Sequence, residues 1–345
     1  MKKCKILFLA PTGSTCCLKD ELILRKHYEV KTVDYSWNKR KSILLLPIKA
    51  FFGLLSCDLT FSWFGSFHAF FAVLFSKIPR KKSIVIIGGY EVAKIQEIGY
   101  GLLVYPIIPH MVRFVLKNAD RVLLVDDSLK ENIIKNTGVS GTYIKTIPTG
   151  YDEQIWKPSR KKKEDLVITV ASVASENRMR VKGVETFVRV AERLPTVKFT
   201  LIGSCNSKCM NYLKSIAPAN VELAGFIPNR ELPQWYSKAK VYCQLSKYEG
   251  LPNSLCEAML CECVPVVTKV GGMPKAVGDT GFYVPYGDME ATVVAITKAL
   301  NCDEATEARE RIKTMFPLRR REEELVQEIE GLLKASEETN ETILY

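Results

Sequence analysis

The chain has 345 residues, of which 47% are hydrophobic and 25% charged, with 20 Gly and 16 Pro. These are the proportions of a globular protein, and they exclude a collagen, a low-complexity chain and a disordered tail protein. The net charge of +11 favours anionic partners such as nucleotides, sugar phosphates or an anionic membrane face. At about 150 residues per domain, the length predicts two domains.

The first half of the chain alternates short apolar runs with longer segments of helical pattern. The apolar runs predict strands at residues 4–10, 30–34, 59–63, 83–87, 121–125 and 143–148. Strands that alternate with helices are typical of a parallel sheet covered on both faces. Residues 158–165 follow as a charged stretch without apolar periodicity, which favours a linker.

A second series of the same kind begins after this stretch. Strands are predicted at residues 166–173, 197–202, 221–226, 241–245 and 264–267, and helices at residues 184–194, 230–239, 253–261 and 289–300. The fold class is therefore α/β, with two doubly wound, Rossmann-like domains. We expect an N-terminal domain at residues 1–149, a hinge at 150–165, a C-terminal domain at 166–310 and a final helical segment at 311–345 that crosses back to the N-terminal domain.

The cysteines and the N-terminal residues indicate the cellular compartment of the protein. The 11 cysteines are unevenly placed, with no two pairs at zinc-like spacing, so we expect reduced cysteines and no metal site. The opening apolar run, residues 6–10, meets Pro11 at once and is too short for a signal peptide core. We therefore expect a cytoplasmic protein. No nucleic-acid-binding motif is present, so we expect no nucleic-acid partner.

The strongest chemical signal is residues 249–259, EGLPNSLCEAM, between a predicted strand and a predicted helix. In doubly wound folds ligands bind at the carboxyl ends of strands, and a helix N-terminus there suits a phosphate. Gly250 permits a close backbone approach, and Asn253 or Ser254 can cap the helix. Glu249 and Glu257 can accept hydrogen bonds from sugar hydroxyls. The alternative is an ordinary capped helix with two acids near its N-terminus.

Two further features favour a ligand site. Lys182 precedes Gly183 after the first strand of this domain, where its ammonium group can reach a phosphate held at the bend. Gly271-Gly272 forms a second tight turn after the next strand, at the same edge of the sheet. Taken alone, Lys182 is equally consistent with a solvated surface lysine.

At these positions the sequence resembles glycosyltransferase family 4. The resemblance is carried by motifs in the family's order: IPTGYD at 147–152, KG at 182–183, LIG at 201–203, GFIP at 225–228, EGLP at 249–252 with EAM at 257–259, and GGMPKAV at 271–277. It implies a GT-B fold, in which two Rossmann-like domains face a cleft, and a retaining, metal-independent enzyme that uses a nucleotide sugar and needs no cofactor. The specific motifs lie in the C-terminal half, while only the general organisation matches in the N-terminal half.

The resemblance also implies roles for single residues. Glu249, beside the donor sugar, and Lys182, beside the diphosphate, would be catalytic. Glu257 would hold the nucleotide ribose. The donor-binding residues would be Gly13, Arg178, Arg180, Lys182, Phe226, Ile227, Glu249, Gly250, Leu251, Pro252, Asn253, Ser254 and Glu257.

The sequence departs from the family pattern at two charged positions. The family pairs its lysine with an arginine that ends the preceding strand, where this chain has VASVA at 170–174, so Arg178 or Arg180 would replace it from the loop. Many members also carry a histidine after the fourth N-terminal strand, where this chain has IGGYE at 87–91. The acceptor-side candidates are Gly88, Gly89, Tyr90, Glu91 and His68.

These observations predict a retaining glycosyltransferase that moves a hexose-type sugar from a nucleoside diphosphate sugar, UDP- or GDP-linked, to a glycan or lipid-linked acceptor. A nucleotide-sugar 2-epimerase and an inactive nucleotide-sugar-binding or membrane-associated protein remain as alternatives. Basic residues flank two apolar runs, with Lys39-Arg40-Lys41 before residues 43–55 and Arg80-Lys81-Lys82 after residues 61–75. This pattern suits a peripheral contact with the inner face of the membrane, although two core helices with solvated basic ends would give it as well.

Overall fold

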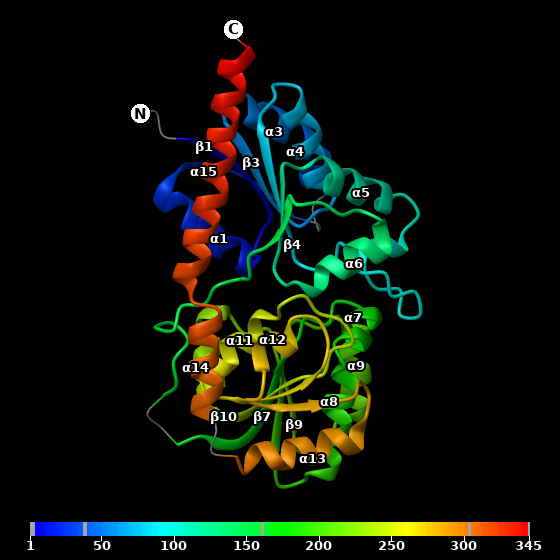
Figure 1. Cartoon of the computed structure of the whole chain (residues 1–345). Helices are drawn as coiled ribbons and strands as arrows, with labels where there is room; N and C mark the ends of the chain where they lie inside the picture. The colour runs from blue at the N-terminus through cyan, green and yellow to red at the C-terminus, as the bar shows by residue number, and fades with distance from the viewer. Residues whose placement is uncertain (1–3, 37–39, 160–161, 303–304, 344–345) are drawn as a thin grey trace. The chain divides into compact units, whose positions relative to one another are not determined.

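The fold is taken from a computed structural model of the whole chain (Figure 1). It describes all residues except 1–3, 37–39, 160–161, 303–304 and 344–345, and it describes no side chain for 40 and 336–343. The chain divides into two compact units. Unit 1 comprises residues 1–95, 101–150 and 318–345, and unit 2 comprises residues 96–100 and 151–317.

Unit 1 is built on a six-stranded parallel sheet in the order β2-β1-β3-β4-β5-β6. Its strands are β1 (Lys5–Pro11), β2 (Glu29–Tyr35), β3 (Leu59–Trp63), β4 (Lys82–Ile87), β5 (Arg121–Leu124) and β6 (Ile144–Thr146). Its helices are α1 (Thr15–His27), α2 (Arg40–Leu44), α3 (Leu46–Leu55), α4 (Phe67–Lys77), the 3₁₀ turn η1 (Leu102–Val104), α5 (Ile108–Asn118), α6 (Ser128–Thr137) and α15 (Leu318–Ile343).

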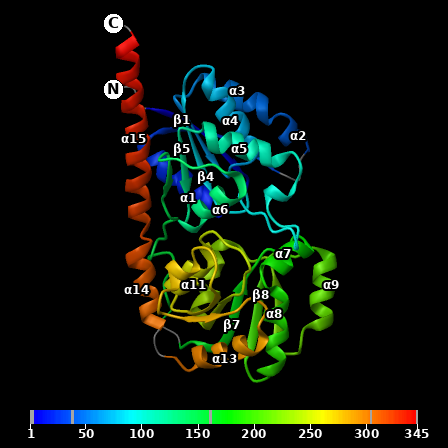
Figure 2. The ribbon, with the colours of Figure 1, turned by 45° about the vertical axis from the view of Figure 1, so that its right-hand side comes forward.

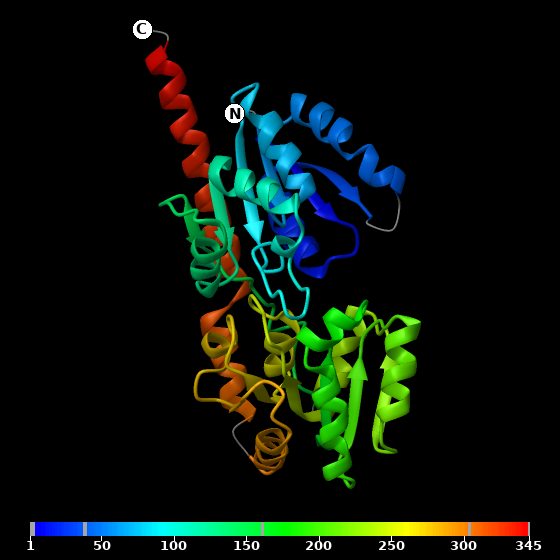
Figure 3. The same cartoon turned by 90° about the vertical axis from the view of Figure 1, so that its right-hand side faces the viewer.

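The helices of unit 1 pack against the sheet with their apolar faces. α3 and α4 lie side by side and share a buried cluster with Leu7 and Leu9 of β1 (Figures 1 and 3). α15 packs against α1, although the two helices are separated by most of the chain (Figure 2). The predicted apolar stripe of α15 is buried here through Leu325, Ile329 and Leu332.

Unit 2 contains a second six-stranded parallel sheet, in the order β12-β11-β10-β7-β8-β9. Its strands are β7 (Glu164–Val170), β8 (Lys198–Ile202), β9 (Val221–Gly225), β10 (Ala239–Gln244), β11 (Val264–Thr268) and β12 (Phe282–Val284). Its helices and turns are α7 (Glu176–Val181), α8 (Val184–Val190), η2 (Ala191–Arg193), α9 (Ser207–Ile216), η3 (Asn229–Glu231), α10 (Leu232–Lys238), α11 (Asn253–Leu260), α12 (Met273–Val277), α13 (Met289–Leu300) and α14 (Ala305–Met315).

The strand order of unit 2 reverses between β7 and β10. β7 is followed by β8 and β9 on one side, whereas β10 is followed by β11 and β12 on the other. Chain segments that leave the carboxyl ends of β7 and β10 therefore diverge to opposite faces of the sheet, which leaves a crevice for ligands at this point. Every donor-binding residue predicted in the C-terminal half lies in unit 2.

Three boundaries differ from the sequence-based expectation. The predicted final segment divides, because residues 311–317 belong to unit 2 and α15 begins at Leu318 in unit 1. Residues 96–100 belong to unit 2, although they stand in the N-terminal half of the chain. The expected linker at 158–165 also ends earlier, because β7 begins at Glu164.

Candidate functional site

The chain brings Lys182 against the carboxyl end of β10 through a glycine. Gly183 adopts φ +63°, and a Cβ there would lie 2.0 Å from the carbonyl oxygen of Leu245, just after β10. Only glycine tolerates this approach. The amide of Lys247 also donates to the carbonyl of Val181 at 2.7 Å. The loop after β7 is thus fixed on the segment that leads into the predicted bend.

Lys182 and Glu249 form an ion pair at this point. The Nζ atom of Lys182 lies 2.6 Å from Oε1 of Glu249, and the two side chains are 22% and 9% exposed. The same oxygen accepts hydrogen bonds from Nε2 of Gln244 at 2.8 Å and from the hydroxyl of Ser246 at 2.6 Å. The structure thus joins two residues predicted to act together, and it adds two neutral donors that fix the carboxylate.

Gln244 belongs to a small buried network below the bend. The hydroxyl of Tyr242 lies 2.8 Å from both Oε1 of Gln244 and the hydroxyl of Ser254. Nε2 of Gln244 also donates to the hydroxyl of Ser246 at 2.9 Å. The network connects the end of β10 to the first turn of α11. Sequence reasoning missed it, although polar residues at the end of an otherwise apolar strand are a usable signal.

The bend itself is braced by the second glycine turn. Gly271 adopts φ +56°, and a Cβ there would lie 2.2 Å from the carbonyl oxygen of Glu249. The amide of Gly272 donates to the carbonyl of Gly250 at 2.7 Å. Leu251 and Pro252 are buried within this turn. The two predicted turns therefore form one backbone assembly at the carboxyl edge of the sheet.

The expected helix cap is wrong. α11 begins at Asn253, the residue at its N-cap is Pro252, and the cap makes no side-chain hydrogen bond. The Asn253 side chain instead accepts from the hydroxyl of Tyr151 at 2.9 Å, while Ser254 joins the Tyr242 network. Both side chains therefore connect α11 to other segments of unit 2 instead of capping it.

Glu257 lies in the second turn of α11. It is the fifth residue of the helix, and only 2% of it is exposed. Its neighbours on the helix from Leu255 to Leu260 are also buried. The contact between Glu257 and the nucleotide ribose stays a prediction.

The two candidate arginines lie on α7, directly before Lys182. Ser175 caps this helix by accepting from the amide of Arg178 at 3.2 Å. Arg178 is half-buried and Arg180 is exposed. The carbonyl of Arg180 accepts from the hydroxyl of Tyr286 at 2.6 Å, at the edge of a cavity of about 260 Å³. Phe226 and Ile227 follow β9 at the same edge of the sheet, and Phe226 is 74% exposed.

A segment that sequence reasoning did not consider borders the site. Residues 96–100 pack on unit 2 through three contacts. Glu97 lies 2.9 Å from the ammonium group of Lys247, Tyr100 packs on Tyr248 with ring centroids 6.2 Å apart, and the carbonyl of Gly99 accepts from Asn177 at 3.1 Å. The first two contacts fall on the residues immediately before Glu249.

The acceptor-side candidates lie in unit 1, and two of them have structural roles. Glu91 is buried and accepts from the amides of Gly88 at 3.0 Å and Gly89 at 2.9 Å, and from Gly65 at 3.3 Å. Burial raises the pKa of this carboxyl group, against the opposing effect of the amides. Glu91 therefore shapes the glycine loop, and its carboxylate is already occupied where we expected a sugar contact. Tyr90 is half-buried in the same loop.

His68, a weaker acceptor-side candidate for which a structural role was the alternative, has that structural role. It is fully buried, with Nδ1 2.8 Å from the hydroxyl of Tyr35 and 3.0 Å from that of Ser66. Nε2 lies 2.5 Å from the carbonyl of Trp63. Burial lowers the pKa of the imidazole to about 4. His68 is therefore a core residue that fixes the start of α4, and it is withdrawn as an acceptor contact. Gly13, after β1, is exposed with φ +83°.

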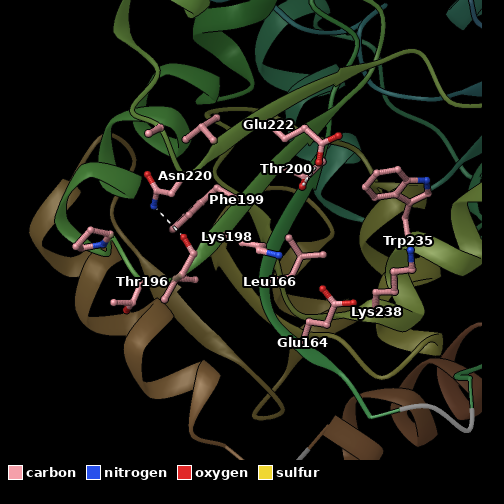
Figure 4. Close-up of a pocket in the computed structure, with 14 residues that line it drawn as sticks. Glu164, Leu166, Thr196, Lys198, Phe199, Thr200, Asn220, Glu222, Trp235 and Lys238 are labelled. Carbon is pink, nitrogen blue, oxygen red and sulfur yellow. Dashed lines mark hydrogen bonds between the residues drawn. The ribbon is translucent and has the colours of Figure 1, made fainter.

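A larger cavity lies at the other end of the sheet of unit 2. It has a volume of about 610 Å³ and opens over the amino ends of β7, β8 and β9, with Glu164, Lys198 and Trp235 in its wall (Figure 4). Because ligands in doubly wound domains bind at the carboxyl ends, this cavity is separate from the predicted site. The described residues contain no group of three His, Cys, Asp or Glu that could hold a metal ion.

Comparison with known proteins finds a family match over part of the chain. Residues 165–302 match the family model of the group 1 glycosyl transferases, which supports the resemblance to glycosyltransferase family 4. The GPI3 subunit of phosphatidylinositol N-acetylglucosaminyltransferase from Saccharomyces cerevisiae is 27% identical over 208 residues, which cover 55% of this chain and 45% of the yeast protein. The chain thus spans less than half of that relative.

Solved structures give the same fold across nearly the whole chain. Sucrose-phosphate synthase from Thermosynechococcus elongatus has a TM-score of 0.79 at 16% identity and covers 96% of this chain and 100% of that one. Anabaena Alr3699/HepE in complex with UDP and glucose has a TM-score of 0.76 at 17% identity, with coverage of 95% and 99%. The chain therefore has the predicted GT-B fold.

Proposed function

We propose that this protein is a retaining glycosyltransferase that transfers a hexose-type sugar from a nucleoside diphosphate sugar to an acceptor. The observation that carries the proposal is the Lys182–Glu249 pair, held at 2.6 Å where the strand order of unit 2 reverses. An ammonium group, a carboxylate and a glycine bend meet there at the start of a helix. This combination can bind a diphosphate and the sugar hydroxyls attached to it.

The donor is proposed from the same residues and from the relatives. The amides at the start of α11 and the ammonium group of Lys182 suit phosphate oxygens, while Glu249 suits sugar hydroxyls. The Anabaena protein with the same fold was solved with UDP and glucose, which supports UDP as the first nucleotide to test. GDP is the second nucleotide to test.

The reaction places its largest electrostatic demand on the leaving group. Negative charge develops on the departing diphosphate, so a preorganised cation beside it lowers the barrier. We assign this role to Lys182, with Arg178 or Arg180 as the second cation. A phosphate oxygen of the donor would take the proton of the attacking hydroxyl, so the chemistry needs no histidine at the position where the family pattern has one. We expect turnover to persist in EDTA.

The acceptor would bind to unit 1. The yeast relative is named for phosphatidylinositol, and this name supports a lipid-linked acceptor for the present chain as well. No helix of the described residues is both long and apolar enough to cross a bilayer. We therefore propose a peripheral contact with the cytoplasmic face of a membrane.

Nucleotide binding is the first test of the proposal. Isothermal titration of the full chain with UDP, GDP and ADP should give one preferred nucleotide. Glu257→Ala should weaken its binding by about 2–4 kcal/mol, the cost of lost hydrogen bonds at a buried charge. Glu262→Ala, a change at a position outside the predicted donor set, is the matched control. Equal affinities for both variants and the parent would remove Glu257 from the site.

Slow release of free sugar from the preferred donor separates an enzyme from a binding protein. We expect hydrolysis without an acceptor, with retention at the anomeric carbon of any transfer product. Binding of a nucleotide without hydrolysis or transfer would favour the inactive alternative. Deuterium uptake at C2 of the sugar in heavy water would favour a 2-epimerase.

A further inference from the structure

Helix α3 carries apolar side chains on two faces. Leu46, Ala50 and Leu54 are buried in the cluster that joins α3 to β1 and α4. On the other side of the helix, Ile48 and Phe52 are 54% and 63% exposed. The outward position of α3 at the surface of unit 1 is visible in Figures 1 and 3. The buried face completes the core, and the second face is an apolar surface in contact with solvent.

The exposed side chains form a stripe along the helix. Leu44, at the end of α2, is 75% exposed, and Leu55, at the end of α3, is 58% exposed. Residues 44, 48, 52 and 55 follow the three-to-four-residue spacing of one helix face. Phe51 packs edge-on against Phe75 of α4, with ring centroids 5.5 Å apart, and supports the stripe from below. Exposed apolar side chains that gather on one helix face, rather than lying singly, are typical of an interaction site.

The turn after α4 extends this surface. Ile78 is 72% exposed, and the neighbouring Lys77 and Arg80 are exposed as well. Lys81 fixes the turn to the end of α3, because its ammonium group donates to the carbonyls of Leu54 at 2.6 Å and Leu55 at 3.2 Å. Lys81 therefore acts as a helix cap, and Ile78 is held beside the end of α3.

The charge of this region is strongly one-sided. Residues 35–90 contain eight Lys and Arg and a single acidic residue, Asp58, so they supply seven of the eleven excess positive charges of the chain. Lys41 and Lys49, on α2 and α3, are both exposed. Lys39 and the side chain of Arg40 lie outside the part of the chain that the structure describes. The apolar stripe is thus accompanied by cations.

The apolar stripe and the excess of positive charge together indicate what would bind this surface. A second copy of the same face would bring its own lysines against these lysines, which is unfavourable for a symmetric interface. A bilayer with anionic lipids accepts apolar side chains below its headgroups and attracts lysines at the headgroup level. α3 has ten residues, too few to cross a bilayer, so it would lie in the plane of the interface.

We propose that the outer faces of α2 and α3, together with the turn at residues 77–80, dock unit 1 on a membrane surface that contains anionic lipid. The inference deepens the proposed function and rests on it for the lipid-linked acceptor. The docking surface lies wholly in unit 1, whereas the proposed donor site in the C-terminal half lies in unit 2. Membrane binding and donor chemistry can therefore be measured separately.

The test is flotation of the full chain with vesicles of phosphatidylcholine alone and with phosphatidylglycerol added. We expect flotation with the anionic vesicles that decreases with salt. Ile48→Ser and Phe52→Ser should each weaken binding by about tenfold or more, since each removes a side chain that would be buried in lipid. Leu22→Ser on α1, 65% exposed in the same unit, is the matched control and should bind like the parent.

Charge variants complete the experiment. Lys49→Glu should weaken binding to anionic vesicles about fivefold, while Lys135→Glu, exposed on α6, should leave it unchanged. Nucleotide affinity should be equal in all variants, which shows that unit 2 remains intact. The proposal is overturned if the parent does not float, if Phe52→Ser floats as well as the parent, or if Phe52→Ser merely converts a dimer to a monomer without a change in vesicle binding.

Discussion

Among the ion pairs that join residues far apart in the sequence, two differ sharply in what surrounds them. In unit 1, Arg321 of α15 meets Asp20 of α1 at 2.6 Å, with both side chains 2% exposed or less. In unit 2, Lys182 meets Glu249 at the same distance, but the lysine is 22% exposed. The first pair is sealed in the core, whereas the second stands at a sheet edge where ligands bind. Equal distances therefore correspond to different roles.

The partners of the sealed pair show what it holds together. Arg321 also donates to the carbonyl of Ile147 and lies over the ring of Trp63, 5.6 Å from its centroid. Asp20 accepts from the indole of Trp63 at 2.8 Å. Four segments of unit 1 thus meet at one guanidinium group. Both oxygens of Asp20 accept hydrogen bonds inside the core, Oδ1 from Arg321 and Oδ2 from Arg321 and Trp63.

The largest effect is expected when the sealed pair is broken. Arg321→Met should lower the free energy of unfolding by about 3–5 kcal/mol, since it leaves the Asp20 carboxylate buried without its cation. Denaturant titration measures the loss. Arg319→Met is the matched control on the same helix, because Arg319 pairs with Glu323 at an exposed position.

A double variant keeps this prediction testable if Arg321→Met does not fold. Arg321→Met with Asp20→Leu removes both charges and should regain part of the stability, since an apolar replacement of a buried pair is often tolerated. The stabilising role of the buried Arg321–Asp20 pair is refuted if Arg321→Met and Arg319→Met unfold at the same denaturant concentration.

A second test of the sealed region uses pH. Burial lowers the pKa of His68 to about 4 in the folded state, below the ordinary value of 6.5. The unfolded chain therefore binds a proton that the folded chain does not between these values, and stability falls as pH decreases from about 6.5 to about 4. The loss amounts to about 3 kcal/mol at the lower limit. His68→Gln should remove this part of the pH dependence, and an unchanged slope would contradict the buried neutral imidazole.

The Lys182–Glu249 pair should affect turnover more than stability. Lys182→Ala should reduce turnover by about 10–100-fold, at about 1.4 kcal/mol for each factor of ten. Its melting temperature should stay close to that of the parent. Lys208→Ala, which removes an exposed partner of Glu176, is the control. Parent-like turnover in Lys182→Ala would remove the lysine from the site.

The smallest effect is expected at the network below Glu249. Gln244→Leu removes one donor to the carboxylate, and we expect about a fivefold decrease in kcat with little change in KM, on the scale of one hydrogen bond. Gln234→Leu, exposed on α10, is the control. A loss of stability without any change in kcat would show that Gln244 only supports the core.

The sequence predicted much of the fold, because short-range patterns determine parallel strands and the helices between them. It also placed Lys182 and Glu249 near each other, since both follow strands whose carboxyl ends share one edge. It did not predict the placement of residues 96–100 in unit 2 or the pairing of Arg321 with Asp20. Contacts across 301 residues leave no local pattern. The burial of Glu91 was equally hidden, because a polar residue type alone does not reveal which of its oxygens the backbone already uses.

Unit 1 takes its first strand and its last helix from opposite ends of the chain. During synthesis, Asp20 and Trp63 leave the ribosome long before Arg321 exists. At about 5–20 residues per second, this delay lasts roughly 15–60 s. By then all of unit 2, residues 96–100 and 151–317, has been synthesised. The half of the protein that is translated first is therefore the half that finishes folding last, and a premature stop before Leu318 would leave it without its final helix.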